Sequence, residues 1–257
     1  MQNKKKYRLE PHSKEFYAGK TKALIYKDED GNKLPYRLLV PPNYDPARQY
    51  PFLICFHGAG TTGDDNLNHL SDWTAGWVDD AVQSEHPCII MMPQCPSGSM
   101  EDRWVQTDWR NGSYSFNEVG ISVYMKMANS VFDNIIEEMS VDENRIYVMG
   151  ASMGGYATWN FVIRNSNRIA AAIPICGAGD PAMADRIKDI AIWAFHGDAD
   201  QTVPPSGSID MIEAIRKAGG TRAKLTMYEN VAHNSHEFPW KDDEVINWMF
   251  QQTKSPV

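Results

Sequence analysis

This sequence has few cysteines, and none of them is placed as a disulfide framework or a zinc site would place it. Its 257 residues include four cysteines, with no Cys-x-x-Cys pair and no zinc-like spacing to histidine. Cys55, Cys88 and Cys176 lie in or beside apolar runs, so we expect small buried side chains there. Cys95 falls in a loop, and its role stays open.

The sequence also lacks a long apolar run and an excess of positive charge. No stretch is long enough to span a bilayer, and the N-terminus does not resemble a signal peptide. We therefore expect a soluble protein, cytoplasmic as written, or secreted if a signal peptide has been removed. With 33 acidic and 25 basic residues, the net charge of −8 argues against nucleic acid and anionic membranes as partners. Composition gives no indication of the oligomeric state.

Apolar runs alternate with helical periodicity, without internal repeats, which predicts an α/β fold. We expect one α/β domain over residues 19–257, preceded by an N-terminal tail or edge segment over residues 1–18. An antiparallel hairpin is expected over residues 21–40, and a mostly parallel sheet with helices on both faces after it. The buried strands are expected at residues 52–56, 88–92, 145–150, 169–176, 190–195 and 225–228. The helices are expected at residues 72–83, 117–139, 154–163, 206–218 and 238–250. The segment between residues 176 and 190 is too short for a large cap domain.

One tight turn organises the chain. Residues 145–150 predict a buried strand, and Gly150-Ala151-Ser152-Met153-Gly154 follows it directly before a helix. Small residues on both sides allow the sharp bend that holds a serine hydroxyl out at the sheet edge. Ser152 is therefore the candidate nucleophile. The same glycines also suit a close packing turn without chemistry, so the assignment depends on a base and an acid elsewhere in the chain.

Those partners follow in the order that a serine hydrolase on a parallel sheet requires. Asp198 and Asp200 come after the strand at residues 190–195, and His233 comes after the last strand. Serine, acid and histidine then lie on three loops at the carboxyl edge of the sheet. On residue order alone, either aspartate is able to orient His233.

A glycine-rich loop follows the strand at residues 52–56. Its Gly58-x-Gly60-x-x-Gly63 spacing matches a dinucleotide fingerprint, but Asp64 and Asp65 would place negative charge beside the phosphates. We therefore interpret it as an oxyanion loop, in which a backbone N–H faces the developing negative charge. Ala59 is the first choice for this donor and Gly60 the second, and Met153 supplies the other N–H of the oxyanion hole.

Residues 93–115 form a long aromatic segment without a clear period, which is typical of a functional loop. We expect it to form one wall of the substrate pocket, with Gln94, Trp104 and Trp109 as the candidate substrate-binding residues.

The combination of these motifs resembles a known family. The matching stretches are Phe56-His57-Gly58-Ala59-Gly60, Pro93-Gln94-Cys95-Pro96, Gly150-Ala151-Ser152-Met153-Gly154-Gly155, His196-Gly197-x-x-Asp200-x-x-Val203-Pro204 and Ala232-His233-Asn234. Together they resemble the compact α/β-hydrolase serine esterases related to feruloyl and acetylxylan esterases (carbohydrate esterase family one) and poly(hydroxybutyrate) depolymerases, whose relatives are often labelled predicted peptidases. The resemblance implies the α/β-hydrolase fold and assigns the acid to Asp200 rather than Asp198.

The resemblance implies a Ser152–His233–Asp200 triad that hydrolyses feruloyl or acetyl esters of plant cell-wall polysaccharide through an acyl-enzyme, without a cofactor. The expected partner is a small-molecule or polysaccharide-linked ester. A peptidase or general short-chain carboxylesterase is the alternative, and a catalytically silent carbohydrate-binding protein is an alternative of another class. His233-x-x-His236-Glu237 lacks a third ligand motif, so we expect no metal.

Overall fold

A computed structural model describes Tyr7 and residues 9–255, and its centre is an eight-stranded sheet. The strand order is β1-β2-β4-β3-β5-β6-β7-β8. β1 pairs antiparallel with β2, and β2 with β4, while the other neighbours are parallel. The strands are β1 (Lys22–Lys27), β2 (Lys33–Leu39), β3 (Tyr50–Phe56), β4 (Ile89–Pro93), β5 (Val141–Ala151), β6 (Ala171–Ile175), β7 (Ala191–Gly197) and β8 (Ala223–Tyr228). The expected α/β-hydrolase sheet and its N-terminal hairpin are confirmed.

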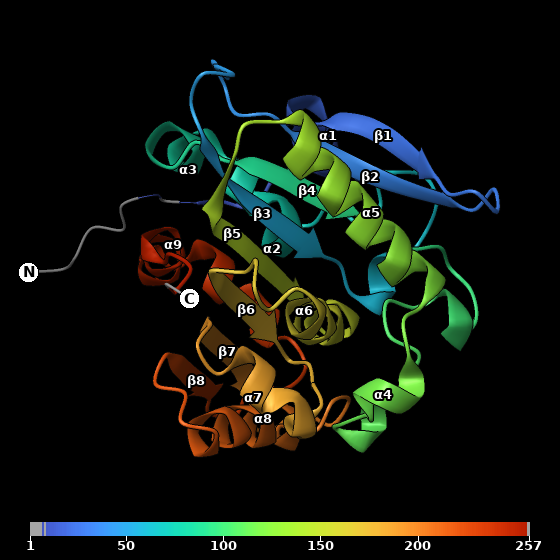
Figure 1. Cartoon of the computed structure of the whole chain (residues 1–257), viewed down its shortest axis with the longest axis vertical. Coiled ribbons are helices and arrows are strands. Elements are labelled where there is room, and N and C mark those ends of the chain that lie inside the picture. The colour runs from blue at the N-terminus through green and yellow to red at the C-terminus, as the bar shows by residue number, and fades with distance from the viewer. Residues whose placement is uncertain (1–6, 8, 256–257) are drawn as a thin grey trace, which may run out of the picture.

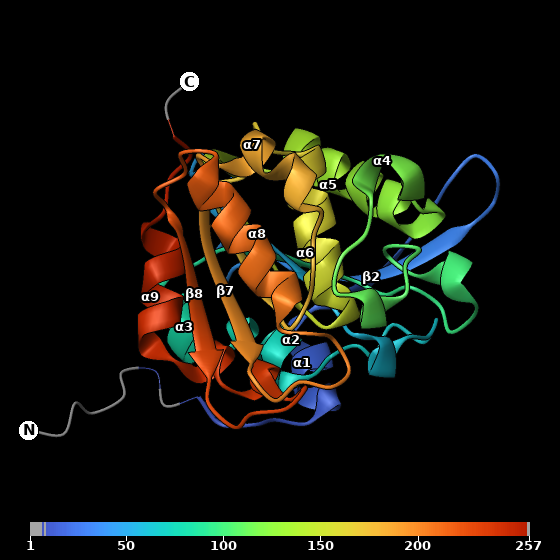
Figure 2. The ribbon, with the colours of Figure 1, turned by 90° about the horizontal axis from the view of Figure 1, so that it is seen from below.

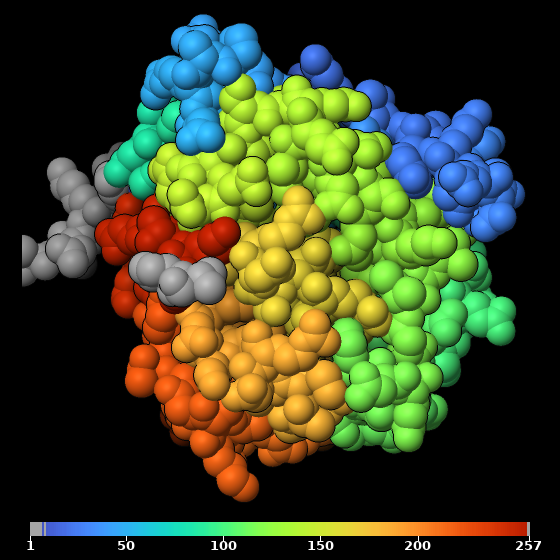
Figure 3. Space-filling model, in the orientation of Figure 1, coloured from blue at the N-terminus to red at the C-terminus, as the bar shows by residue number. Residues whose placement is uncertain are grey.

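Helices cover both faces of this sheet (Figure 1). They are α1 (Lys14–Lys20), α2 (Asp72–Ala75), α3 (Asp80–Glu85), α4 (Phe116–Val119), α5 (Val123–Glu138), α6 (Met153–Arg164), α7 (Ala184–Ile187), α8 (Ser206–Lys217) and α9 (Asp243–Gln251). One face packs under α5, α6 and α8, and the other under α1, α2, α3 and α9. Figure 3 shows α5, in yellow-green, and the orange segment of α7 and α8 covering the face nearest the viewer.

The central strands are apolar throughout because they bury both faces. Every residue of β3 is buried, and its side chains alternate between the two halves of the core. Phe52, Ile54 and Phe56 pack beneath α5 and α6, whereas Leu53 and Cys55 pack on the opposite side. The arrowheads of β7 and β8 lie side by side at one end of the sheet (Figure 2). The loops after these parallel strands therefore meet at a common edge.

The N-terminal segment differs from the tail or edge segment expected over residues 1–18. Residues 1–6 and 8 lie outside the described part of the chain, but α1 begins at Lys14 and crosses the expected boundary. Tyr17 is fully buried, and its hydroxyl donates to Asp72 at 2.7 Å. This helix belongs to the packed domain, because Tyr17 fills the core on the α2 side of the sheet.

Three expected helices are interrupted. The helix expected over residues 238–250 is divided into the 3₁₀ turn η7 (Pro239–Lys241) and α9, with Asp242 as the N-cap of α9. The helix expected over residues 117–139 is divided into α4 and α5, because Gly120 adopts φ 71°, a conformation that a helix cannot continue through. The helix expected over residues 72–83 is divided into α2, a 3₁₀ turn and α3, where Asp79 caps the last piece.

The β6–β7 connection is short, and the helices of the described chain are not of the membrane-spanning kind. Between β6 and β7 the chain forms only the 3₁₀ turn η5 (Pro181–Met183) and the one-turn helix α7, so this connection carries no cap domain. Over residues 7 and 9–255, none of the helices combines the length and apolar character needed to cross a bilayer.

Candidate active site

Ser152 stands at the sharp turn between β5 and α6. Its backbone has φ 58° and ψ −123°, a strained conformation for a residue with a side chain. A Cβ on Gly154 would lie 2.1 Å from the Phe56 carbonyl oxygen, and one on Gly150 would lie 2.4 Å from the Gly154 carbonyl oxygen. Only glycine fits at these two positions. The packing of β5, α6 and β3 thus forces the bend that exposes the Ser152 hydroxyl.

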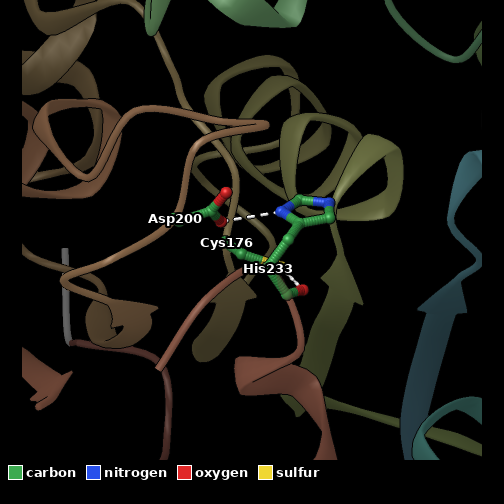
Figure 4. A group of neighbouring side chains, drawn as sticks. All are labelled: Cys176, Asp200 and His233. Atoms are coloured by element: carbon green, nitrogen blue, oxygen red, sulfur yellow. Dashed lines mark hydrogen bonds and ion pairs between the residues drawn. The ribbon is translucent and has the colours of Figure 1, made fainter. Parts of the chain in front are cut away.

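His233 brings the hydroxyl and a carboxylate together. Its Nε2 lies 2.8 Å from Ser152 Oγ, and its Nδ1 lies 2.7 Å from Asp200 Oδ2 (Figure 4 shows the bond to Asp200). Because an ionised carboxylate only accepts, Nδ1 carries the proton and Nε2 faces the serine hydroxyl as an acceptor. The three residues come from the loops after β5, β7 and β8. This arrangement suits proton transfer from the hydroxyl to the ring.

Asp200 is held as an ionised carboxylate. Its Oδ1 accepts hydrogen bonds from the backbone N–H groups of Thr202, at 2.8 Å, and Val203, at 3.0 Å. The ring nitrogen Nε2 of His196 also lies 3.4 Å from Oδ2. Burial by itself would raise the pKa of Asp200, but the hydrogen bonds from His196, His233 and the backbone outweigh it and lower the pKa. Asp198 instead accepts from the Asn230 N–H at 2.7 Å, so its carboxylate does not meet His233.

The candidate oxyanion donors both begin a helical turn. Met153 is the first residue of α6, and Ala59 is the first residue of the 3₁₀ turn η1 (Ala59–Thr61). The N–H groups of a first turn have no acceptor within their own helix, which leaves them available for a ligand. Gly58, Ala59 and Gly60 line the same pocket as Ser152.

This pocket has a volume of about 340 Å³ and aromatic walls. Trp109 lies on one wall, with the Arg103 guanidinium stacked 3.8 Å from its ring centre. Trp73 and His236 also line the pocket, with ring centres 5.7 Å apart in an edge-to-face arrangement. Burial lowers the pKa of His236, so its ring is neutral at pH 7. The pocket therefore offers flat, uncharged surfaces beside the serine hydroxyl.

The structure corrects two of the expected substrate-binding residues. Trp104 is fully buried, and its indole N–H donates to the His57 carbonyl oxygen at 3.2 Å. Gln94 is also fully buried, with its side chain bonded to the Asn66 N–H at 2.7 Å and to Asp65 at 2.9 Å. Both residues brace loops behind the pocket, because their polar atoms had to find partners inside the core. Of the three expected residues, only Trp109 reaches the pocket.

Five pocket residues were not identified as site residues from the sequence, namely Thr61, Trp73, Ala151, Thr202 and His236. Trp73 was assigned only to a helix, because no local pattern marks the one turn of α2 that faces the site. Thr202 lies within the His196-Gly197-x-x-Asp200 motif, and that context was the available signal. His236 was considered only as a metal ligand.

Among the described residues, the one group with metal-ligand chemistry is Cys176, Asp200 and His233 (Figure 4). The ligand-type atoms lie within 4.8 Å of one another. Asp200 and His233 already bond each other, and burial raises the pKa of the Cys176 thiol to about 12. These donors are therefore better suited to a hydrogen-bonded row than to a metal. All four cysteines are free and buried, Cys95 included.

Comparison with known proteins shows a family match over most of the chain. The family described as phospholipase/carboxylesterase matches residues 42–239. A solved structure titled as a thermostable esterase shares 33% identity and superimposes with a TM-score of 0.85, over 93% of this chain and 64% of that one.

Two curated proteins are similar in sequence. A bifunctional acetylxylan esterase/xylanase of Neocallimastix patriciarum is 22% identical over 178 residues, which cover 69% of this chain and 23% of that protein. Feruloyl esterase D of Neurospora crassa is 24% identical over 175 residues, which cover 66% of this chain and 54% of that protein. The chain thus spans about a quarter to a half of the length of these relatives.

Proposed function

Because this chain belongs to the phospholipase/carboxylesterase family of α/β-hydrolase enzymes, we propose that it is a serine esterase whose triad is Ser152, His233 and Asp200. The observation that carries the proposal is the pair of hydrogen bonds on His233, 2.8 Å to Ser152 and 2.7 Å to Asp200. Both are already within the range that proton transfer needs.

The reaction proceeds in two halves. His233 Nε2 takes the proton of Ser152 as Oγ attacks the ester carbonyl carbon, and the carbonyl oxygen becomes an oxyanion bound by the N–H groups of Ala59 and Met153. When the carbon–oxygen bond of the ester breaks, His233 returns the proton to the leaving alcohol. Water then gives a proton to His233 as its oxygen attacks the carbonyl carbon of the acyl-enzyme. The bond between this carbon and Ser152 Oγ breaks, His233 returns the proton to Oγ, and the acid leaves. Asp200 stabilises the ring each time it is positively charged. No cofactor takes part.

For the substrate, we propose feruloyl or acetyl esters of plant cell-wall polysaccharide. The names of the two curated relatives support both acyl groups. The aromatic pocket favours a feruloyl group, because Trp73 and Trp109 offer faces on which a phenyl ring can stack. An acetyl group would leave most of the roughly 340 Å³ unfilled.

Replacement of Ser152 by alanine tests the assignment. We expect kcat for p-nitrophenyl acetate to fall on the order of 10⁴-fold or more, because the nucleophile is removed while the pocket remains. Ser84→Ala is the matched control, since this exposed serine lies at the end of α3 and is outside the pocket. Unchanged turnover by the Ser152 variant would overturn the triad.

A panel of methyl ferulate, acetylated xylan, a short-chain aliphatic ester and a peptide amide tests the substrate class. We expect the highest kcat/KM for methyl ferulate. Preferential cleavage of the peptide amide would instead establish the peptidase alternative. A chain that binds the polysaccharide without any ester burst would establish the silent binding protein.

A further inference from the structure

His57 is a buried histidine whose two ring nitrogens are both engaged. It follows Phe56 at the end of β3 and is fully inaccessible to solvent. The Cys95 N–H donates to Nε2 at 3.0 Å, and Nδ1 lies 2.8 Å from the Gly58 carbonyl oxygen. A backbone N–H can only donate and a carbonyl can only accept, so Nε2 is unprotonated and Nδ1 carries the proton. The contacts therefore fix one neutral tautomer of the ring.

The carbonyl that accepts from this ring belongs to the peptide bond that carries the Ala59 N–H. The described chain contains no cis peptide bond, so the Gly58 carbonyl and the Ala59 N–H point in opposite directions from one planar unit. With its oxygen bonded to the buried ring, the unit turns its N–H away from the core. On that side lies the pocket, where a Cβ on Gly58 would stand 3.6 Å from Ser152 Cβ.

Two kinds of contact hold this peptide, and only one ties it to the sheet. The backbone N–H of Thr61 donates to the Gly58 oxygen at 3.2 Å, as does its hydroxyl at 3.2 Å, but Thr61 belongs to the same 3₁₀ turn and moves with it. The His57 ring instead connects the peptide to Cys95, just beyond β4. The Trp104 indole fixes the preceding carbonyl, that of His57, at 3.2 Å.

We propose that His57, braced by Trp104, is a positioning residue that aims the Ala59 N–H at the developing oxyanion. The inference rests on the proposed esterase function and adds a residue to it that touches neither substrate nor the triad. It also gives Trp104, which the substrate does not reach, a part in the reaction.

The His57 ring keeps this role at neutral pH. Burial lowers the pKa of His57 to about 4, so the ring remains neutral at pH 6 to 8. A second proton on Nε2 would face the Cys95 N–H and break that contact.

Two substitutions of His57 separate its bonds. In His57→Asn the amide nitrogen replaces Nδ1 and continues to donate to Gly58, whereas in His57→Gln the amide oxygen replaces Nε2 and continues to accept from Cys95. Each variant loses one hydrogen bond of the His57 ring, so the two should be destabilised to a similar extent, and each serves as the control for the effect of lost stability on the other. We expect His57→Gln to lower kcat for p-nitrophenyl acetate at least tenfold with KM within about twofold, because the oxyanion forms only in the transition state. His57→Asn, which keeps the bond to the Gly58 oxygen, should retain more of its kcat than His57→Gln.

The affinity for the inhibitor phenylboronic acid is a second measurement, and a purely structural role of His57 would leave it unchanged. This compound forms a tetrahedral adduct with an active serine, so we expect its affinity for His57→Gln to fall by the same factor as kcat. If both variants are folded and show equal kcat, or if boronate affinity is unchanged, the positioning role is wrong.

Trp104→Phe keeps the inference testable if the His57 variants do not fold. It removes the indole N–H that binds His57 while an aromatic ring still packs against Phe56. We expect a several-fold loss in kcat with KM unchanged, and full kcat would count against the proposal. The Ser152→Ala protein distinguishes failure of the esterase assignment from failure of the positioning role. If Ser152→Ala is still active, the esterase assignment is wrong. If Ser152→Ala is inactive but the His57 and Trp104 variants are fully active, only the positioning role is wrong.

Discussion

Replacing Ala59 by proline removes one backbone N–H and little else. Ala59 opens a 3₁₀ turn, a position where proline is well tolerated because no N–H is needed there. The preceding Gly58 has φ −85° and ψ 174°, the extended conformation required before proline. The bond from the Thr61 N–H to Gly58, at 3.2 Å, does not involve the Ala59 nitrogen and can persist. The substitution is therefore a targeted deletion of the proposed oxyanion donor.

The expected loss follows from the chemistry of that donor. Removing one oxyanion-hole donor lowers kcat about 10² to 10³-fold, or roughly 3 to 4 kcal/mol of transition-state stabilisation. KM should change little, because the neutral ester carbonyl of the ground state depends less on this bond. Met153 retains its N–H, so the hole is halved rather than abolished.

The assay is steady-state hydrolysis of p-nitrophenyl acetate together with thermal unfolding. Gly60→Ala is the control, since nothing lies within 4 Å of the added Cβ and every N–H remains. A folded Ala59→Pro protein with kcat within threefold of the wild type would refute the reasoning and move the donor to Gly60.

Three further predictions concern the pocket, the elbow and acid stability. Trp109→Ala should raise KM for methyl ferulate in steady-state assays, because Trp109 lines the pocket. Trp104→Ala should instead lower the free energy of unfolding by about 3–5 kcal/mol in urea titration, because Trp104 is buried in the core. Equal effects of the two substitutions on KM would contradict the placement of the two rings. Gly154→Ala should destroy the native near-UV circular dichroism, since its Cβ would lie 2.1 Å from Phe56 oxygen, and a folded, active variant would contradict that packing. Burial lowers the pKa of His57 to about 4 and that of His69 to about 3, so the unfolded chain takes up these protons first as pH falls below about 6.5. Stability is thus complete above pH 6.5 and declines below it, by roughly 2 kcal/mol for each ring at pH 5, and identical urea midpoints at pH 7 and pH 5 would contradict this.

The sequence predicted those features that local pattern determines. Continuous apolar runs marked β3 and β7 because both faces of these strands are buried. The Gly150-x-Ser152-x-Gly154 turn was predictable because the close packing requires glycine at two positions. A Cβ on Gly154 would clash with the Phe56 backbone, and a Cβ on Gly150 would clash with the Gly154 backbone. Residue order placed Ser152, His233 and either Asp198 or Asp200 at one sheet edge, and the family resemblance pointed to Asp200. The structure joins Ser152, His233 and Asp200 by hydrogen bonds.

The features that were missed depend on tertiary contacts. An aromatic residue in a long loop suggests a pocket wall, but Trp104 packs inward because the His57 carbonyl offers its N–H an acceptor. Trp73 reaches the pocket because the single turn of α2 lies across Gly58, and no period reveals a turn of four residues. The break at Gly120 was hidden within an apolar pattern that continues on both sides of it.

The most direct test of the account is to find which residue reacts as the nucleophile. Protein treated with an aryl fluorophosphonate and digested for mass spectrometry should carry one adduct, on Ser152, and His233→Ala should label far more slowly because the base is absent. Ester turnover accompanied by an adduct on a different residue, or by none, would contradict the proposed role of Ser152.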